Sequence, residues 1–171
     1  YSVGTVTPTA APSMDIQVSS NFERLLFDLH GRDGKALAAA MAGFERDRHL
    51  ALSDAQRAAA ATLFTSARVD EDGMALAMRW ASGNAAEVID PHSAIGLAAA
   101  RAAAIPADIP VVTLATAHPA KFPDAVERAT GIRPPLPPRL AGLFDREERC
   151  ASLPAELKAI EAYIAERATP A

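Results

Sequence analysis

The sequence predicts an α/β chain that is rich in helices, holds few strands and contains one strong buried strand near residues 109–116. Three observations lead to this class. Half of the 171 residues are apolar but only 5% are aromatic, and much of the apolar part is alanine, the best helix former. Apolar residues recur at helical spacing in several segments that begin with capping side chains. One segment, IPVVTLAT, is apolar on both faces, which is typical of a parallel strand covered by helices.

The first thirteen residues are expected to form a loop or an extended segment. Residues 1–13 hold small and β-branched side chains together with Gly4, Pro8 and Pro12, which do not favour a helix. None of these side chains is charged, whereas a free N-terminal tail is usually more polar. We interpret residues 1–13 as chain that lies against a larger protein.

Three capped helices are expected between residues 20 and 64. Capping boxes, in which a serine side chain and a Glu or Gln three residues later bond to each other's backbone, are predicted at Ser20–Glu23 and Ser53–Gln56. Asp33 is predicted to cap the helix between them. The first of the three is expected to stop at Gly31, a residue that tolerates the left-handed conformation at helix ends.

The middle of the chain is expected to hold a short strand and two helices. Residues 65–69 have the composition of a short strand, and residues 70–82 read as a helix. Asp90 followed by Pro91 is a helix start with a capping side chain and a proline in the first turn. The helix that follows is expected to run to about residue 104.

The strongest predicted strand, 109–116, comes next. Beyond it, a helix is expected over 123–130 with Gly131 as its stop, then a stiff polyproline connection over 133–139. A last helix is predicted to begin at Ser152. One strand cannot make a sheet, so either the sheet is small or its other strands belong to chain that is absent here.

We therefore divide the chain into three parts. Residues 1–13 form an extended segment from a parent protein, residues 14–132 form a helical and α/β part, and residues 133–171 form a proline-rich connection with a terminal helix. The first residue is Tyr1 and not Met, which agrees with an N-terminus that was removed or lies upstream.

Composition excludes several classes of function. The net charge is -4 and no basic run is present, so nucleic acid is not an expected partner. The longest apolar runs, such as Leu97 to Ala100, are far too short to span a membrane. The single cysteine, Cys150, permits no internal disulfide and fits a cytoplasmic location. The four histidines, His30, His49, His92 and His118, lack partners at metal-ligand spacing, so we expect no metal site.

Two polar segments are candidates for chemistry. The segment from Asp90 to Gly96 opens a helix with polar groups. The segment from Thr116 to Phe122 follows the strongest predicted strand, where open α/β sheets place their ligands. It gathers a hydroxyl, an imidazole and an amine on Thr116, His118 and Lys121. From spacing alone, a turn with helix caps is the favoured interpretation of this segment, and a surface charge is the favoured interpretation of Lys121.

A third candidate is the start of the first predicted helix. Ser20 and Asn21 present a hydroxyl and an amide at a helix N-terminus, which favours anions, so a substrate phosphate is a conceivable ligand. A capping role alone also explains Ser20.

Three segments of the chain resemble the C-terminal part of threonine synthases. They are SMDIQVSSNFERLLF at 13–27, the Pro-His motif within 90–96, and TAHPAKF at 116–122 followed by PDAVERATG. Their order and spacing match the family over most of the chain. TAHPAKF is highly specific and the Pro-His pair alone is not, while residues 133–171 match only loosely.

The resemblance implies a fold like the tryptophan synthase β subunit, the fold type II group of pyridoxal-phosphate enzymes. It implies conversion of O-phosphohomoserine and water to L-threonine and phosphate. In that fold a Ser or Thr after a core strand faces the pyridine nitrogen of the cofactor, and Thr116 occupies the matching position. A neutral hydroxyl there leaves the ring nitrogen largely unprotonated. Ser20, Asn21, His118 and Lys121 are the substrate-binding candidates.

The family's aldimine lysine belongs to a motif like H-G-P-T-x-x-F-K-D in the N-terminal half, and that motif is absent here. The three lysines, Lys35, Lys121 and Lys158, lie in other surroundings. No catalytic residue is therefore expected in this chain, which we predict to be inactive alone and to bind pyridoxal phosphate weakly. Apolar surfaces that faced the missing half are expected to cause self-association.

Two alternatives remain open. The chain can be a stand-alone helical interaction domain without a cofactor, in which the helix stripes serve as a partner surface. It can also be another lyase of the same fold group, such as a threonine dehydratase. The TAHPAKF segment argues against the second alternative.

Overall fold

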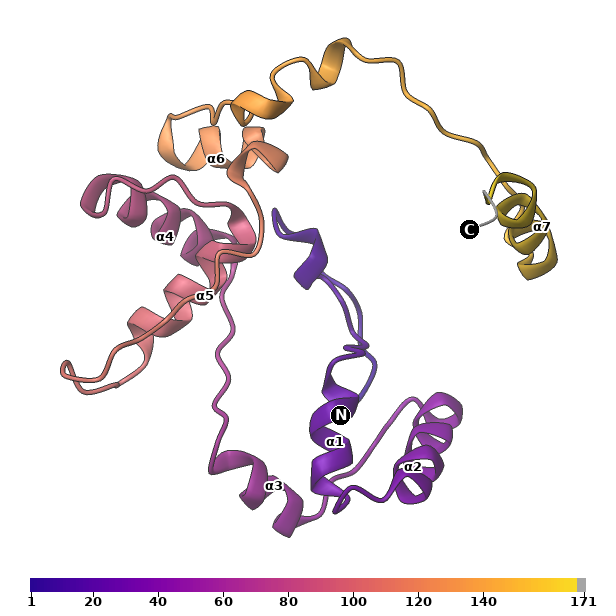
Figure 1. Ribbon diagram of the computed structural model, residues 1–171. Coiled ribbons are helices and arrows are strands. Elements are labelled where there is room, and N and C mark those ends of the chain that lie inside the picture. The colour runs from indigo at the N-terminus through magenta and orange to yellow at the C-terminus, as the bar shows by residue number, and fades with distance from the viewer. Residues whose placement is uncertain (169–171) are drawn as a thin grey trace. The chain divides into compact units, whose positions relative to one another are not determined.

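The computed structural model describes residues 1–168 and divides into two compact units, Tyr1–Pro135 and the chain from Leu136 onward. The first unit is helical (Figure 1). Its helices are α1 (Phe22–Leu29), α2 (Gly34–Asp47), α3 (Asp54–Ala61), α4 (Glu71–Asn84), α5 (Pro91–Ala102) and α6 (Pro123–Thr130). Two short 3-10 helices, η1 (Pro12–Met14) and η2 (Pro119–Lys121), complete it.

The predicted strands are wrong. No strand ladder forms among residues 1–168, where only an isolated antiparallel bridge pairs Ser2 with His49. Residues 109–116, predicted as a buried strand, run as an unpaired coil between α5 and η2, and Val112 and Leu114 are 83% and 73% exposed. Residues 65–69 also form coil. A strand needs the N–H and C=O groups of a neighbouring strand, and no described segment offers them.

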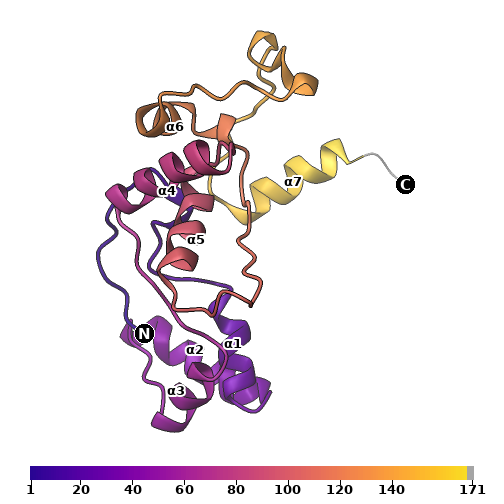
Figure 2. The same cartoon turned by 90° about the vertical axis from the view of Figure 1, so that its left-hand side faces the viewer.

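The larger core lies where α4 packs against α5 and α6, an arrangement visible in Figures 1 and 2. The buried side chains of α4 follow helical spacing, since Met74, Ala77, Met78 and Ala81 lie on one face. Alanines at these positions bring the helix axes close together, which explains a core with few aromatics. Ala11 and the buried residues Ala94, Val126 and Ala129 complete this core.

A second core joins α1, α2 and the first residues of the chain. Leu26, Phe44 and Leu50 are its buried members. The ring of Tyr1 stacks on Phe44 with centroids 4.8 Å apart and meets Phe22 edge-on at 5.1 Å. The terminal ammonium of Tyr1 donates to the Leu50 carbonyl at 2.8 Å. Aromatic packing and this hydrogen bond therefore hold the N-terminal segment against α1 and α2.

The helix caps test the sequence patterns residue by residue. Asp33 accepts from the N–H groups of Lys35 and Ala36, and Ser53 forms a full capping box with Gln56, as predicted. Gly31, with φ of 63°, follows the end of α1, also as predicted. The capping box at Ser20 is wrong, because Asn21 occupies the cap position without a side-chain hydrogen bond. The Ser20 backbone carbonyl accepts from the Glu23 N–H, so residues 20–23 already form a helix-like turn.

Three later predictions are confirmed and one shifts. Helix α4 starts after the cap Asp70, α5 starts at the Asp90 cap with Pro91 in its first turn, and α6 ends at Gly131 with φ of 75°. In the second unit, α7 (Leu157–Arg167) begins at Leu157 and not at Ser152. The Glu156 N–H donates to the Pro154 carbonyl in a separate turn ahead of this helix.

The second unit holds η3 (Pro138–Leu140), η4 (Leu143–Asp145) and α7. The apolar side chains of α7 remain exposed, and Arg167 lies over the Tyr163 ring at 3.8 Å from its centroid. Within residues 1–168, no helix is both long and apolar enough to cross a membrane.

Two substitutions on α4 test the larger core. Met74 is 1% exposed and Leu76, two residues away, is 60% exposed. Met74→Ala leaves a cavity and is expected to lower the free energy of unfolding by about 2–5 kcal/mol. Leu76→Ala, the matched control, is expected to change it by about 0.5 kcal/mol or less. Urea denaturation followed by circular dichroism measures both, and equal losses would contradict the assignment of this core.

Candidate functional site

A buried carboxylate organises the N-terminal end of α5. Asp90 is fully buried and each of its two oxygens accepts from two donors. Oδ2 accepts from the backbone N–H of His92 at 3.0 Å and from His92 Nδ1 at 2.8 Å. Oδ1 accepts from the backbone N–H of Ser93 at 3.1 Å and from the Ser93 hydroxyl. Asp90 therefore caps the helix and fixes two polar side chains beside it.

These contacts set the charge of Asp90. Burial acts to raise the pKa of its carboxyl, but the hydrogen bonds from Ser93 and His92 outweigh burial and lower the pKa below its ordinary value. Asp90 is consequently an anion at neutral pH, and its charge strengthens the bonds that it accepts.

Two segments distant in sequence attach to this carboxylate through its partners. The Thr116 backbone N–H donates to the Ser93 hydroxyl oxygen at 3.0 Å. The Ser13 backbone N–H, which belongs to η1, donates to His92 Nε2 at 3.2 Å. Because Nε2 accepts a hydrogen bond and Nδ1 faces a carboxylate, His92 is the neutral tautomer with its proton on Nδ1. We call Asp90, His92 and Ser93 the anchor triad.

The loop from Thr116 to Phe122 lies against the anchor triad. The Phe122 ring contacts the His92 ring with centroids 4.7 Å apart. Thr116 itself is exposed, and within residues 1–168 its hydroxyl makes no hydrogen bond. The backbone of Thr116 is thus fixed while its side chain is free to meet a ligand.

The two other candidates on this loop occupy η2. The His118 Nδ1 accepts from the Ala120 N–H at 3.1 Å and so caps this 3-10 helix, which leaves its proton on Nε2. Lys121 is exposed at the end of η2, and in the described part of the chain its amine forms no ion pair. The structure therefore carries Thr116, His118 and Lys121 on one short loop.

Ser20 and Asn21 lie elsewhere in the first unit, at the start of α1. Both residues are exposed and neither side chain forms a hydrogen bond within residues 1–168. In the same residues, no hydrogen bond or ion pair links them to the loop from Thr116 to Phe122. The structure does not bring these two candidates together with the other three.

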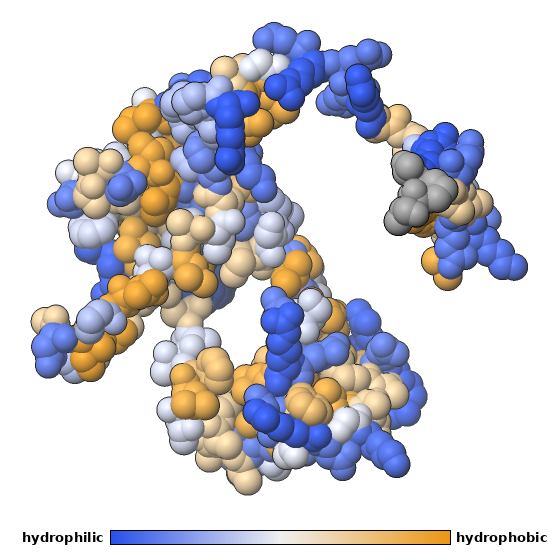
Figure 3. Space-filling view, in the orientation of Figure 1, coloured by the Kyte–Doolittle hydropathy of each residue, from blue (hydrophilic) through white to orange (hydrophobic). Residues whose placement is uncertain are grey.

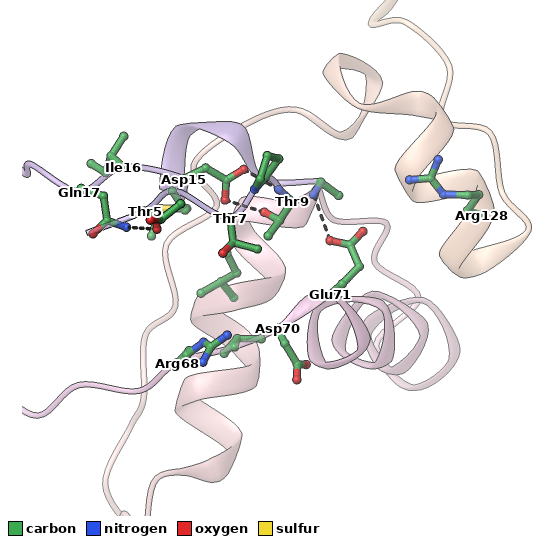
Figure 4. Close-up of a pocket in the computed structure, with 15 residues that line it drawn as sticks. Thr5, Thr7, Thr9, Asp15, Ile16, Gln17, Arg68, Asp70, Glu71 and Arg128 are labelled. Carbon is green, nitrogen blue, oxygen red and sulfur yellow. Dashed lines mark hydrogen bonds between the residues drawn. The ribbon is translucent and has the colours of Figure 1, made fainter. Parts of the chain in front are cut away.

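The first unit also contains a cavity of about 830 Å³ that sequence reasoning did not predict (Figure 4). It is lined by the N-terminal segment, by the chain entering α4, by Ile95 of α5 and by Arg128 of α6. Its charged lining is mixed, with two arginines and three carboxylates: Arg68, Arg128, Asp15, Asp70 and Glu71. Thr116, His118 and Lys121 do not line it.

Internal hydrogen bonds already engage part of this lining. The Asp15 carboxylate accepts from the Thr9 N–H at 2.7 Å and from the Thr9 hydroxyl at 2.8 Å. Glu71 accepts from the Ala10 N–H at 3.0 Å. The only sequence signal was the alternation of hydroxyls at Thr5, Thr7 and Thr9, which places them on one side of an extended chain. In the described residues, no group of three or more His, Cys, Asp or Glu side chains is placed to hold a metal ion.

The polar start of α5 was predictable from the sequence, but the partners of its side chains were not. Ser93 and Thr116 are 23 positions apart, and Ser13 and His92 are 79 positions apart. No local pattern connects residues at such separations.

Comparisons with known proteins identify the relatives of this chain. The family model "Threonine synthase, C-terminal" matches residues 93–164. The threonine synthase of Pseudomonas aeruginosa is 47% identical over 167 residues, which are 97% of this chain and 36% of that enzyme. Among solved structures, the PLP-bound threonine synthase from Brucella melitensis is 42% identical with a TM-score of 0.85, covering 98% of this chain and 36% of its own.

Yeast threonine synthase is a more distant structural relative, at 27% identity and a TM-score of 0.79, with 94% of this chain and 36% of its own covered. The chain thus spans about a third of the length of the relatives that it matches.

The anchor triad makes a pH-dependent contribution to stability. The pKa of Asp90 is lowered in the fold, so its stabilisation is present above the unfolded value of about 3.9 and is lost as the pH falls through the lower folded value. Asp90→Asn puts an amide N–H₂ against buried donors and is expected to cost about 1–3 kcal/mol at pH 7. It is also expected to flatten the loss of stability below about pH 4. Urea denaturation from pH 2 to 7 measures both.

The exposed Asp108 provides a matched control, because it makes no side-chain hydrogen bond within residues 1–168. Asp108→Asn is expected to leave both the stability and its pH dependence close to those of the wild type. An Asp90→Asn curve that parallels the wild-type curve at acid pH would contradict the role assigned to the carboxylate.

Proposed function

The chain belongs to the threonine synthase family, and on that premise we propose that it forms the C-terminal part of an enzyme converting O-phosphohomoserine and water to L-threonine and phosphate. The 47% identity over almost the whole chain carries this proposal. The two alternatives, a stand-alone interaction domain and another lyase of the same fold group, have no comparable support.

Thr116 is the residue that we assign to the cofactor, pyridoxal phosphate, which would supply an electron sink when bound. The fit of this residue rests on two observations: its backbone is fixed by Ser93, and its neutral hydroxyl has no partner within residues 1–168. A neutral hydroxyl can donate to a pyridine nitrogen without giving it a full proton. Thr116 would thus hold and orient one edge of the cofactor.

His118 and Lys121 are assigned to the substrate. The proton on His118 Nε2 points away from the bond that Nδ1 accepts, so this edge of the imidazole can donate to a polar ligand. Lys121 carries a flexible cation on the same loop and is suited to attract the substrate phosphate.

Ser20 and Asn21 are assigned a secondary part in phosphate binding. Their exposed side chains stand at the N-terminus of α1, where the helix dipole favours an anion. The sequence motif that contains the family's cofactor-binding lysine is absent from these 171 residues, so we expect no turnover by this chain alone.

The proposal extends to the compartment in which the protein works and to its association with other copies of itself. The protein is assigned to the cytoplasm, because its single exposed cysteine, Cys150, suits a reducing compartment.

The coil between α5 and η2 exposes five large apolar residues: Ile105, Ile109, Val111, Val112 and Leu114. Figure 3 shows hydrophobic surface on the part of the first unit that contains this coil. Exposed apolar chain with unpaired backbone groups invites pairing with another chain, so we assign self-association to this segment.

A chimera tests the activity. The C-terminal third of the Pseudomonas aeruginosa enzyme is replaced by these 171 residues, and phosphate release from O-phosphohomoserine is measured with the native Pseudomonas enzyme as the positive control. The chimera is expected to release phosphate. Thr116→Val keeps the shape but loses the hydroxyl and is expected to lower kcat about tenfold, the equivalent of one hydrogen bond of about 1.4 kcal/mol. Thr116→Ser is expected to retain most of the activity.

The result that would overturn the assigned activity is specific. It is a folded chimera that shows the visible absorbance of bound pyridoxal phosphate but releases no phosphate from O-phosphohomoserine. An unchanged kcat in Thr116→Val would instead contradict the assignment of Thr116 and leave the activity in place.

Sedimentation velocity tests self-association of the 171-residue chain. The wild type is expected to form dimers or larger species at micromolar concentration, and the double variant Val112→Lys, Leu114→Lys is expected to sediment as a monomer because charge opposes strand pairing. Leu63→Lys replaces an equally exposed leucine outside the segment and is the control, expected to associate as the wild type does. A wild-type monomer at all concentrations rules out the proposal.

A further inference from the structure

We infer that Ser93, held by the Asp90 carboxylate, is a positioning residue that fixes Thr116 for its contact with the cofactor. This inference rests on the proposed function, because it takes Thr116 as the cofactor contact. It starts from one observation: the Ser93 hydroxyl stands between the buried carboxylate of α5 and the backbone N–H of Thr116.

The hydroxyl of Ser93 has only one possible arrangement of hydrogen bonds. The Asp90 carboxylate only accepts, so it takes the single hydroxyl proton, and the Thr116 N–H only donates, so it uses an oxygen lone pair. Ser93 is 5% exposed, which leaves little access for competing water. A hydroxyl with both roles fixed cannot rotate without breaking a bond to a charged group.

The rest of the segment around Thr116 has almost no other attachment. Within the described chain, the bond from Thr116 to Ser93 is the single hydrogen bond made by the backbone of residues 110–117. Most of these residues are exposed. Without Ser93, the position of Thr116 would depend on a flexible coil and on the packing of Phe122 further along.

Asp90 and Ser93 are in turn fixed by the larger core. Ala94, the next residue of α5, is fully buried in the larger core, which also contains residues of α4 and α6, and the Ala94 N–H donates to the Asp90 carbonyl. His92 occupies the second oxygen of Asp90 and prevents the carboxylate from turning. The core therefore fixes the Asp90 carboxylate, which holds the Ser93 hydroxyl, which in turn holds the Thr116 N–H. The Thr116 hydroxyl takes no part in these bonds.

Amide exchange of the 171-residue chain tests the contact without any cofactor. In hydrogen–deuterium exchange followed by NMR, Ser93→Ala is expected to speed exchange at the Thr116 amide about tenfold, which corresponds to one lost hydrogen bond of about 1.4 kcal/mol. Ser82→Ala on α4 removes a serine without a side-chain hydrogen bond in the described residues and is expected to leave this amide unchanged. An unaltered Thr116 amide in Ser93→Ala would overturn the inference.

The chimera tests the positioning role. Ser93→Ala is expected to lower kcat about tenfold with little change in KM, and to shift the visible absorbance of the bound cofactor in the direction that Thr116→Val shifts it. Ser93→Thr, which keeps the hydroxyl, is expected to restore both. If Ser93→Ala does not fold, Ser93→Cys, with a weaker donor and acceptor, is expected to give a smaller effect of the same kind.

A double variant separates positioning from a general structural role. If Ser93 acts through the Thr116 hydroxyl, the variant carrying both Ser93→Ala and Thr116→Val is expected to be no slower than Thr116→Val alone. Additive losses, or an unchanged kcat and absorbance in Ser93→Ala beside a slowed Thr116→Val, would overturn the positioning role and leave the proposed function intact. A Thr116→Val variant with full activity would instead show that the cofactor assignment itself has failed, and the inference with it.

Discussion

The carboxylate of Asp90 is the group on which the arrangement of the first unit depends. A buried anion is tolerated only when its oxygens are satisfied, and here α5 supplies both pairs of donors from its own first turn. The side chains recruited in this way then bind backbone from η1 and from the loop after residue 115. The capping motif of α5 thus joins three segments: α5 itself, η1 and the loop after residue 115. A neutral capping side chain at the same place would bind the two other segments less strongly.

The helix caps and stops that could be predicted from the sequence are those that depend on neighbouring residues. Asp33, Ser53 and Gly131 were predictable because a cap or a left-handed stop depends on residues within one turn. Ser20 failed as a cap for an equally local reason, since the backbone turn ahead of α1 moved the cap to Asn21. Residues 109–116 failed because pairing depends on a partner strand, and apolar composition alone does not supply one.

The candidate site divides in the same way. Thr116, His118 and Lys121 were predicted together because seven consecutive residues carry the family motif, and the relatives found by comparison support the family assignment. The hydrogen bond between Thr116 and Ser93 was not predictable, because the residues next to each of them in the sequence do not indicate this contact. The cavity next to Asp15 was missed because its walls come from four separate parts of the chain. The residues that we assign to the site were thus identified from a local motif, and the contacts that position Thr116 were not.

The single attachment of residues 110–117 has a consequence for proteolysis. Exposed coil with few hydrogen bonds is the preferred substrate of proteases, and the chain between α5 and Thr116 combines both properties. A cut there would separate α5 from the loop covalently, yet the bond between Ser93 and Thr116 and the contact between the rings of His92 and Phe122 lie outside the cut. The two products would remain associated as a nicked protein, because the anchor triad would still bind the loop on the other side of the cut.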